Sequence, residues 1–403
     1  PILEEVSQFS SEKKYMVTTH MDGKKQVKFM KGAAEVVLDM CTHLLEQGKI
    51  IPFTVALRGK VIAENDGMAS RALRVLAMAF EERGMMVLVG LIGMLDPPRD
   101  GVREAIAAAR EAGIRTIIIT GDHSLTARAI GEKVGVQSPV VEGKELDEMH
   151  EDFLRERLKT VSIFARVSPE HKVKILEALQ HSGEIVAMGG DGVNDAPALK
   201  KAHVGFAMGR KGTDVARETA QIVLTDDHFS TVVEAIEEGR TIYDNIRKFV
   251  VFLLRANFDE LLVVFTTILL GFPLPLLPIH LLLINLVTDS LPAIALALEK
   301  PEPNVMRRPP RDPGAHILHG ERFFIFLAAI IAAAATFQVF FWGWKLHADI
   351  DLARTLALTT AILFELFLVM TCRSRRSLLR IGFFSNPYLL GAVAIGFTAL
   401  LAF

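Results

Sequence analysis

Hydrophobic positions follow two different patterns along this chain, and one gives way to the other between about residues 230 and 250. In the first part, apolar runs of strand length alternate with amphipathic stretches of helix length. In the second part, charged residues thin out and apolar runs of about 20 residues, long enough to span a bilayer, follow one another. The pattern therefore predicts a soluble portion joined to a helical membrane portion.

Residues 1–85 are expected to form part of a small α+β domain. Two strand-like runs, 15–19 and 26–30, are separated by Met21-Asp22-Gly23-Lys24, which predicts a hairpin. Lys31-Gly32 then leads into a helical stretch. A lysine at such a turn can meet a nucleotide phosphate, and a solvated lysine is the alternative.

Residues 86–230 predict a doubly wound parallel sheet, because apolar strands alternate there with amphipathic helices. A strand over 86–92 precedes a helix over 99–112. Further strands are expected at residues 114–119, 162–165, 184–188, 203–207 and 221–224.

Two carboxylates and an amide follow the strand expected at 184–188. The backbone can turn at Gly189-Gly190 without a Cβ penalty, and Asp191, Asn194 and Asp195 come directly after the turn. Open α/β sheets bind their ligands at the carboxyl ends of strands, and oxygen ligands there suit Mg²⁺ beside a phosphate. The alternative is a solvated Asp/Gly turn.

A hydroxyl and an ammonium group recur at other strand ends or loops of the same predicted sheet. Thr120 lies in Thr120-Gly121-Asp122, and Lys172 closes the run Ser168-Pro169-Glu170-His171-Lys172. Each has an ordinary alternative, a helix cap or an exposed lysine. Together with the carboxylates they predict a phosphoryl-transfer site at one edge of the sheet.

The membrane portion begins with a helical pattern that runs from about Asp227 into 250–254, as expected of a stalk helix. Apolar runs end near residues 270, 298, 344 and 370, and a last one starts at residue 388. The basic connections 300–311 and 373–376 predict the cytosolic side by the positive-inside rule. The turn at 271–275 has no Lys or Arg and is expected outside.

Polar groups inside those runs are costly in a bilayer, so each is a functional hypothesis. They share helix faces within the first two runs, and one glutamate lies alone in the fourth. Their oxygens suit a hard cation such as Ca²⁺, whereas helix-to-helix hydrogen bonding is a plausible alternative for the hydroxyl but a poor one for three carboxylates. The residues are Asn257, Glu260, Asn285, Thr288, Asp289 and Glu365.

Composition removes several classes of function. The net charge of −2 over 403 residues gives no case for nucleic acid. Cys41 and Cys372 are too few for a disulfide framework or a thiolate metal site. The opening residues resemble the middle of a domain, so we expect no signal peptide.

The phosphate-site motifs resemble those of a known family. Thr120-Gly121-Asp122, the Lys172 segment and the run from Gly190 to Pro197 resemble the later motifs of the haloacid-dehalogenase phosphotransfer fold, which is Rossmann-like. Asp96-Pro97-Pro98-Arg99 and Lys31-Gly32-Ala33 narrow the resemblance to P-type ATPases. The run from Asn285 to Ala293 resembles the sarcoplasmic-reticulum type of Ca²⁺ pump.

The resemblance implies roles for individual residues. Around an aspartyl phosphate it places Thr120, Gly121, Asp122 and Lys172, with Mg²⁺ held by Asp191 and the site completed by Asn194 and Asp195. On the ATP side it places Phe9, Lys14, Lys31, Arg74 and, more loosely, Arg166. One cation site would comprise Asn257, Glu260, Thr288, Asp289 and Glu365, and a second would include Asn285 and Asp289.

The same resemblance implies three domains. Residues 1–85 correspond to the C-terminal part of an α+β nucleotide-binding domain, and 86–230 to part of a haloacid-dehalogenase-like α/β phosphorylation domain. Residues 231–403 correspond to the stalk and the fifth to ninth helices of an α-helical transmembrane domain, with the last helix missing. The phosphorylated Asp-Lys-Thr-Gly-Thr motif occurs nowhere in the sequence. We therefore expect an inactive fragment whose partner is the missing N-terminal half.

The function expected of the whole protein is ATP-driven export of Ca²⁺ from the cytosol, through an aspartyl-phosphate cycle. The chain would cross the plasma membrane several times, with its catalytic domains in the cytosol. Two alternatives stay open: a Na⁺- or H⁺-handling relative, and a membrane-anchored phosphatase of the haloacid-dehalogenase type.

Two residues depart from the calcium-pump pattern. Asp259 stands where those pumps have a glycine, and Arg255 where they have a small polar residue. Four positions apart, the two lie on one helix face, so we predict that they form an ion pair beside the site. The other interpretation makes Asp259 a cation ligand.

Overall fold

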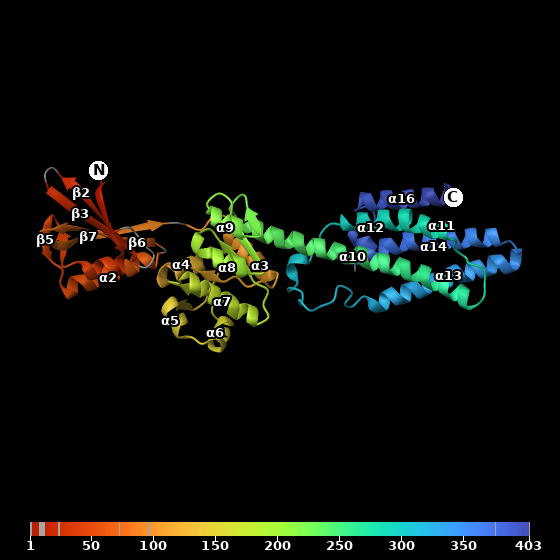
Figure 1. Cartoon of the computed structure of the whole chain (residues 1–403), viewed down its shortest axis with the longest axis horizontal. Helices are drawn as coiled ribbons and strands as arrows, with labels where there is room; N and C mark the ends of the chain where they lie inside the picture. The colour runs from red at the N-terminus through yellow and green to blue at the C-terminus, as the bar shows by residue number, and fades with distance from the viewer. Residues whose placement is uncertain are drawn as a thin grey trace. The chain divides into compact units, whose positions relative to one another are not determined.

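The computed structural model describes residues 2–7, 13–22, 25–71, 73–95, 97–374 and 376–402. The chain divides into two compact units, residues 1–233 and 234–403. Each unit is described by itself, with the elements labelled in Figure 1.

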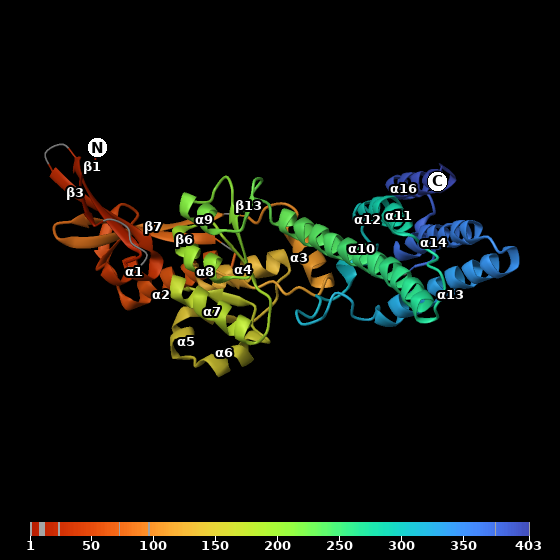
Figure 2. The ribbon, with the colours of Figure 1, turned by 45° about the vertical axis from the view of Figure 1, so that its right-hand side comes forward.

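The first unit opens with a seven-stranded sheet on which two helices pack. The strand order is β1 (Ile2–Ser7), β2 (Tyr15–Asp22), β3 (Lys25–Ala33), β6 (Leu73–Glu82), β7 (Met85–Leu95), β4 (His43–Glu46) and β5 (Lys49–Pro52). The helices are α1 (Ala34–Met40) and α2 (Val55–Ala69), seen against the sheet in Figure 2. Val37, Leu38 and Leu88 are buried between them. The hairpin predicted from residues 15–30 is confirmed as the antiparallel pair β2–β3.

The strand expected over residues 86–92 is β7, but it does not open the parallel sheet. It pairs antiparallel with β6 and so extends the first sheet. The cause is local: Arg83 and Gly84 between the two strands have φ of 50° and 79°. Consecutive positive φ values make the tight turn that joins neighbouring antiparallel strands.

Two short parallel sheets follow. The first has the order β8 (Ile118–Ile119), β10 (Ile163–Ala165), β9 (Val140–Glu142), and the second β11 (Ala187–Gly190), β12 (Val204–Met208), β13 (Ile222–Leu224). Parallel strands alternating with helices were predicted, but as one sheet. In the part of the chain that the structure describes, β8 and β11 are each an edge strand, and no strand pairing joins them.

The helices around these sheets alternate with the strands along the chain. They are α3 (Val102–Glu111), α4 (Ser124–Val134), α5 (Gly143–Glu148), α6 (Glu151–Leu158), α7 (Pro169–His181), α8 (Ala196–Lys201) and α9 (Asp214–Thr219). The core between sheet and helices includes Leu146, Leu154, Phe164 and Ile175, each with at most 1% of its surface exposed.

The second unit is helical. It begins within α10 (Phe229–Leu269), a continuous 41-residue helix that confirms the helical pattern predicted from about Asp227. The others are α11 (Pro278–Leu283), a π-helical segment (Ile284–Asp289), α12 (Ser290–Ala297), α13 (Arg322–His347), α14 (Ile350–Cys372), α15 (Leu378–Ile381) and α16 (Pro387–Ala402). Within this unit, α13 packs against α14.

Three helical stretches in the described residues are long and apolar enough to cross a membrane: Pro278–Ala297, Arg322–His347 and Ile350–Cys372. They correspond to three of the five spans expected from the sequence. The other two differ for physical reasons: α16 has only 16 residues, and the apolar half of α10 carries Arg255, Asp259 and Glu260.

Arg373, in the basic connection expected on the cytosolic side, is buried. Its guanidinium donates from Nε and Nη2 to the two carboxylate oxygens of Glu299, at 3.1 and 2.9 Å. Asn386 donates to the same carboxylate at 2.9 Å. Burial alone would raise the pKa of Glu299, but the hydrogen bonds from Arg373 and Asn386 outweigh burial and lower that pKa. The pair ties the end of α12 to the segment between α14 and α16.

Candidate functional sites

The turn after β11 is organised by Asp195. One of its oxygens accepts hydrogen bonds from the backbone amides of Asp191 and Gly192, at 3.2 and 3.1 Å. The other accepts from the Lys172 ammonium. A side chain at Gly190 would place its Cβ only 2.4 Å from that of Asp195, so glycine is required there. The carboxylate of Asp195 is buried and fully used in shaping the loop.

Asp191 and Asn194, in contrast, are exposed at the same strand end. Asp191 contributes its backbone to the loop, through its amide to Asp195 and its carbonyl to Thr213, while its side chain reaches solvent. A solvent-facing carboxylate beside an ordered loop fits a Mg²⁺ ligand, since Mg²⁺ keeps several waters and takes one or two protein carboxylates.

The Thr120 loop lies against the segment that leads into α7. The Thr120 hydroxyl donates to Asp122 at 3.0 Å and accepts from the Asp122 amide at 3.1 Å. The carbonyl of Thr120 accepts from the Val167 amide at 3.2 Å, and the carbonyl of Asp122 accepts from the Arg166 amide at 3.0 Å. Residues 166–172 thus connect the Thr120 loop to Lys172 and, through it, to Asp195.

The residues expected to meet ATP lie on the first sheet or beside it. Lys14, Lys31 and Arg74 are exposed, and Lys31 on β3 is the register partner of Met16 on β2. Arg166 is engaged in ion pairs with Glu35 at 3.1 Å and Glu142 at 3.9 Å. Phe9 falls outside the described residues.

Four polar residues of the apolar helices meet in two pairs across helices. The Asn285 amide donates to Glu260 Oε2 at 3.2 Å, which links the π-helical segment to α10. The Thr288 hydroxyl lies 3.1 Å from Glu365 Oε2, which links the same segment to α14. Asn257 is exposed, and its amide donates to the Leu253 carbonyl of its own helix at 2.8 Å.

Four carboxylate oxygens in this group are buried and have no hydrogen-bond partner: one each of Glu260 and Glu365, and both of Asp289. The exposed fractions of these residues are 8%, 0% and 1%. A buried polar atom without a partner costs about 1–3 kcal/mol, so such oxygens fit a ligand that supplies positive charge. As they stand, no three His, Cys, Asp or Glu side chains of the described residues are close enough together to hold a metal ion.

The π-helical segment sets the position of Asp289. Pro292 has no backbone N–H and clashes with a regular helical carbonyl four residues earlier, so the helix must widen before it. The Ser290 hydroxyl donates to the Asn285 carbonyl at 2.7 Å within the widened turn. Single π-helical turns occur frequently at functional sites.

Comparison with known proteins relates both units to one family. A family model described as "P-type ATPase, cytoplasmic domain N" matches residues 2–101, and one described as "Cation transporting ATPase, C-terminus" matches residues 273–403. Together they match more than half of the chain. The chain belongs to the P-type cation-transporting ATPases.

Relatives of this P-type ATPase chain match along almost its whole length. It is 41% identical to calcium-transporting ATPase 1 of Bacillus cereus, covering 96% of this chain and 47% of that protein. The calcium-transporting ATPase of Bacillus subtilis is 40% identical, with 97% and 46% covered. The probable cation-transporting ATPase F of Mycobacterium tuberculosis is 41% identical, with 96% and 45% covered. The chain therefore spans about half the length of these relatives.

The sequence reasoning missed an ion pair with a buried carboxylate in the first unit of this P-type ATPase chain. Asp227 accepts hydrogen bonds from the backbone amides of Arg210 and Lys211, at 2.9 and 3.0 Å, and lies 3.7 Å from the Arg99 guanidinium. These amides, together with Arg99, hold the pKa of Asp227 below its ordinary value, against the effect of burial. The one available signal was Arg99 in Asp96-Pro97-Pro98-Arg99, a segment used above only for the family resemblance.

The predicted Arg255–Asp259 ion pair is wrong. Arg255 lies 3.7 Å from Glu321 and its Nη1 3.4 Å from the Cys372 sulfur, and among the described residues no ion pair joins it to Asp259. The i,i+4 spacing allowed the pair, but the start of α13 offers Arg255 another carboxylate.

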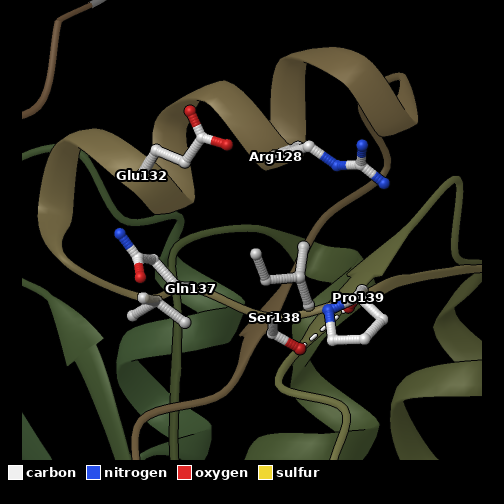
Figure 3. A pocket seen from close by; sticks show the side chains of 7 residues that line it. Arg128, Glu132, Gln137, Ser138 and Pro139 are labelled. Carbon is white, nitrogen blue, oxygen red and sulfur yellow. Dashed lines mark hydrogen bonds between the residues drawn. The ribbon is translucent and has the colours of Figure 1, made fainter.

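A hollow of about 480 Å³ lies apart from this chemistry. Arg128 and Glu132 on α4 face Ser138 and Pro139 across it (Figure 3). None of the sequence-predicted site residues lines this hollow. We therefore do not assign the active site to it.

Proposed function

We propose that this chain is the C-terminal half of an ATP-driven pump that exports Ca²⁺ from the cytosol through an aspartyl-phosphate cycle. The observation that carries the proposal is the set of four unpartnered, buried carboxylate oxygens of Glu260, Asp289 and Glu365, contributed by three apolar segments. Two relatives that match at about 40% identity are named calcium-transporting ATPases, which supports Ca²⁺ as the cargo.

The phosphorylation site would be completed by the other half of the protein. The acceptor aspartate would come from that half, with Thr120, Gly121, Asp122 and Lys172 around the phosphate. Asp191 would hold Mg²⁺, which neutralises phosphate charge during transfer. Asp195 accepts hydrogen bonds from Lys172 and from the loop amides, so it would position the Lys172 ammonium and the Asp191 loop. Exposed Asn194 would complete the site.

The free edges of β8 and β11 support a haloacid-dehalogenase-like domain that this chain only partly contains. An unpaired strand edge exposes a row of backbone donors and acceptors that another strand can satisfy. We infer that a strand from the missing half, carrying the acceptor aspartate at its carboxyl end, pairs with both edges. This would bring the Thr120 loop and the Asp191 loop to the two sides of one phosphate.

ATP would bind on the first sheet, where Lys14, Lys31 and Arg74 are exposed and can meet its phosphates. Phe9 remains a proposed stacking residue. Arg166 would contact ATP as well if its ion pair with Glu35 or Glu142 opened.

Transported Ca²⁺ would be bound by Glu260, Asn285, Thr288, Asp289 and Glu365, whose oxygens are the ligand type that hard cations prefer. Asn257 would take part only after its amide turns from the Leu253 carbonyl. The chain would cross the plasma membrane several times with the first unit in the cytosol. The Na⁺ and H⁺ alternatives draw no support from the relatives' names, and a membrane-anchored phosphatase would have no use for buried carboxylates in its anchor.

The test is transport by the complete protein in sealed vesicles. With Mg²⁺-ATP present, radioactive Ca²⁺ should accumulate, and Asp289→Asn should abolish accumulation, because it removes a charge with no substitute partner. Asp351→Asn, at an exposed carboxyl of α14, is the matched control and should transport normally. ATP-driven movement of Na⁺ or H⁺ without Ca²⁺ uptake would overturn the proposal.

A further inference from the structure

A polar cavity of about 440 Å³ in the second unit takes no part in the proposed pump cycle. Side chains from α10, from the connection between α12 and α13, and from the end of α14 line it. Its charged lining residues are Asp244, Arg247, Lys248, Arg255, Glu302, Arg308, Glu321 and Arg376. Because five of these are basic and three acidic, the described lining attracts an anion.

Ion pairs within the lining leave a surplus of positive charge. Each acidic side chain already has a basic partner within 4.0 Å, and the pairs are Asp244 with Arg308, Glu302 with Lys248, and Glu321 with Arg247. Arg255 only shares Glu321 with Arg247, at 3.7 Å. Arg376 is exposed, and the hydrogen bond that it donates within the described residues comes from its backbone amide, to Ser374.

The guanidinium of Arg255 has an unused donor. Its Nε is buried and has no hydrogen-bond partner. Its Nη1 lies 3.4 Å from the sulfur of Cys372, which is a weak acceptor. A buried donor without an acceptor is costly, so this guanidinium fits a ligand that supplies oxygen atoms. Arginine binds phosphate oxygens through its planar fork, often with two parallel hydrogen bonds.

The cavity lies where two candidate membrane spans end. Glu321 immediately precedes α13, and Cys372 is the last residue of α14. Phe323 and Phe324, in the first turn of α13, have 70% and 56% of their surface exposed. The end of a span lies at the level of the lipid headgroups, and exposed apolar side chains of the span meet the lipid.

We propose that this cavity binds the phosphate group of an anionic phospholipid headgroup, with Arg255 and Arg376 as its phosphate-binding side chains. The inference goes beyond the proposed function and does not depend on which cation is transported. Basic pockets between transmembrane helices on the cytosolic side suit anionic headgroups, and the basic connection 373–376 is expected on that side. Inorganic phosphate offers the same oxygens, but it has no acyl chain to contact Phe323 and Phe324.

The experiment measures binding of phosphatidylglycerol to the purified complete protein in a neutral detergent, by native mass spectrometry. At about 0.15 M ammonium acetate, charges more than about 8 Å apart are largely screened. The wild type should bind phosphatidylglycerol more tightly than phosphatidylcholine. Arg255→Gln and Arg376→Gln should each raise the dissociation constant for phosphatidylglycerol about tenfold, because each removes hydrogen bonds to a charged group.

Arg380→Gln is the matched control. Arg380 is exposed, follows Arg376 by four positions and does not line the cavity. Its replacement removes the same charge and should change the dissociation constant by less than about twofold. Equal losses in Arg376→Gln and Arg380→Gln would show general attraction to a basic surface and would overturn the site.

Gel filtration and thermal unfolding in detergent check that the variants fold. If Arg255→Gln does not fold, Arg376→Gln decides, because that side chain is exposed. Inorganic phosphate is the second probe, followed by calorimetry. Phosphate binding that both substitutions weaken, together with equal binding of phosphatidylglycerol and phosphatidylcholine, would assign the cavity to free phosphate and overturn the lipid. Phosphatidylglycerol that excess phosphate does not displace supports the lipid.

Discussion

At the scale of single residues, the same side-chain type serves different purposes according to its partners. Asp195 is buried and used up by Lys172 and two loop amides, whereas Asp191, four positions earlier, is exposed. Glu299 is neutralised by Arg373, whereas Asp289 has no partner for either oxygen. The carboxylates without partners are the ones that we propose to bind a cation, and those with partners stabilise the fold.

Asp227 gives a prediction at this scale. Its pKa is lowered in the folded protein, so its charged form stabilises the fold above its unfolded pKa of about 3.9. This stabilisation should be lost as the pH falls through the lower, folded pKa. Asp227→Asn should therefore lower the melting temperature at pH 7, and the difference from the wild type should shrink below about pH 4.

Thermal unfolding followed by circular dichroism between pH 3 and pH 7 measures this difference. The matched control is Asp152→Asn, because the carboxyl of Asp152 is 98% exposed. An Asp227→Asn difference that stays constant across this range would contradict the lowered pKa.

At the scale of elements, the decisive features are the two open strand edges and the π-helical segment. β8 and β11 end in the Thr120 and Asp191 loops, so the strand expected between them would also assemble the phosphate site. The segment Ile284–Asp289 depends on Pro292, and it places Asn285 and Thr288 toward different helices. The candidate phosphate site thus depends on two strand edges, and the candidate cation site depends on an irregular helical turn.

We predict that this chain alone forms no phosphoenzyme from radiolabelled ATP, and that the complete protein does. The reason is that phosphoryl transfer by such a site depends on groups positioned around an acceptor, and the acceptor motif is absent from the sequence. In the complete protein, Asp191→Asn should abolish Mg²⁺-dependent phosphorylation while ATP binding stays within about twofold. Label bound covalently to this chain alone, or normal phosphorylation by the variant, would refute the assignment.

At the scale of the whole molecule, the chain combines an α/β unit with a helical unit whose described residues include three candidate membrane spans. Helix α10 begins in the first unit and continues into the second, where it carries Glu260, a proposed cation ligand. For the proposed pump, the direction of transport depends on how the spans are oriented.

Orientation gives the last prediction. A cysteine introduced as Ser374→Cys or Arg376→Cys should react with a membrane-impermeant reagent only from the cytosolic side, because basic segments stay there. A cysteine introduced in the turn before α11, as Pro273→Cys, should react only from the outside. Both are made in a background with Cys41 and Cys372 replaced by serine. Labelling of residue 376 from outside would reverse the topology.

The sequence by itself determined the local features of this protein. Periodicity predicted the β2–β3 hairpin, the alternation of strands and helices, the three candidate spans and the continuous helix α10. The sequence motif predicted that Asp191, Asn194 and Asp195 follow the end of a strand. In the structure they follow β11, and Lys172 donates a hydrogen bond to Asp195. These features depend on neighbours in the chain, and so a pattern can report them.

Only the tertiary structure decided which side chains meet across long separations. Spacing paired Arg255 with Asp259, but Glu321, 66 positions away, lies close to Arg255 instead. The sequence showed Arg373 only as part of a basic connection, but in the structure Arg373 is buried against Glu299, which also accepts a hydrogen bond from Asn386. A turn placed β7 in the first sheet. In each case the sequence offers several chemically equivalent partners for a side chain or a strand. The packing of the folded chain decides which of them lies close enough to interact.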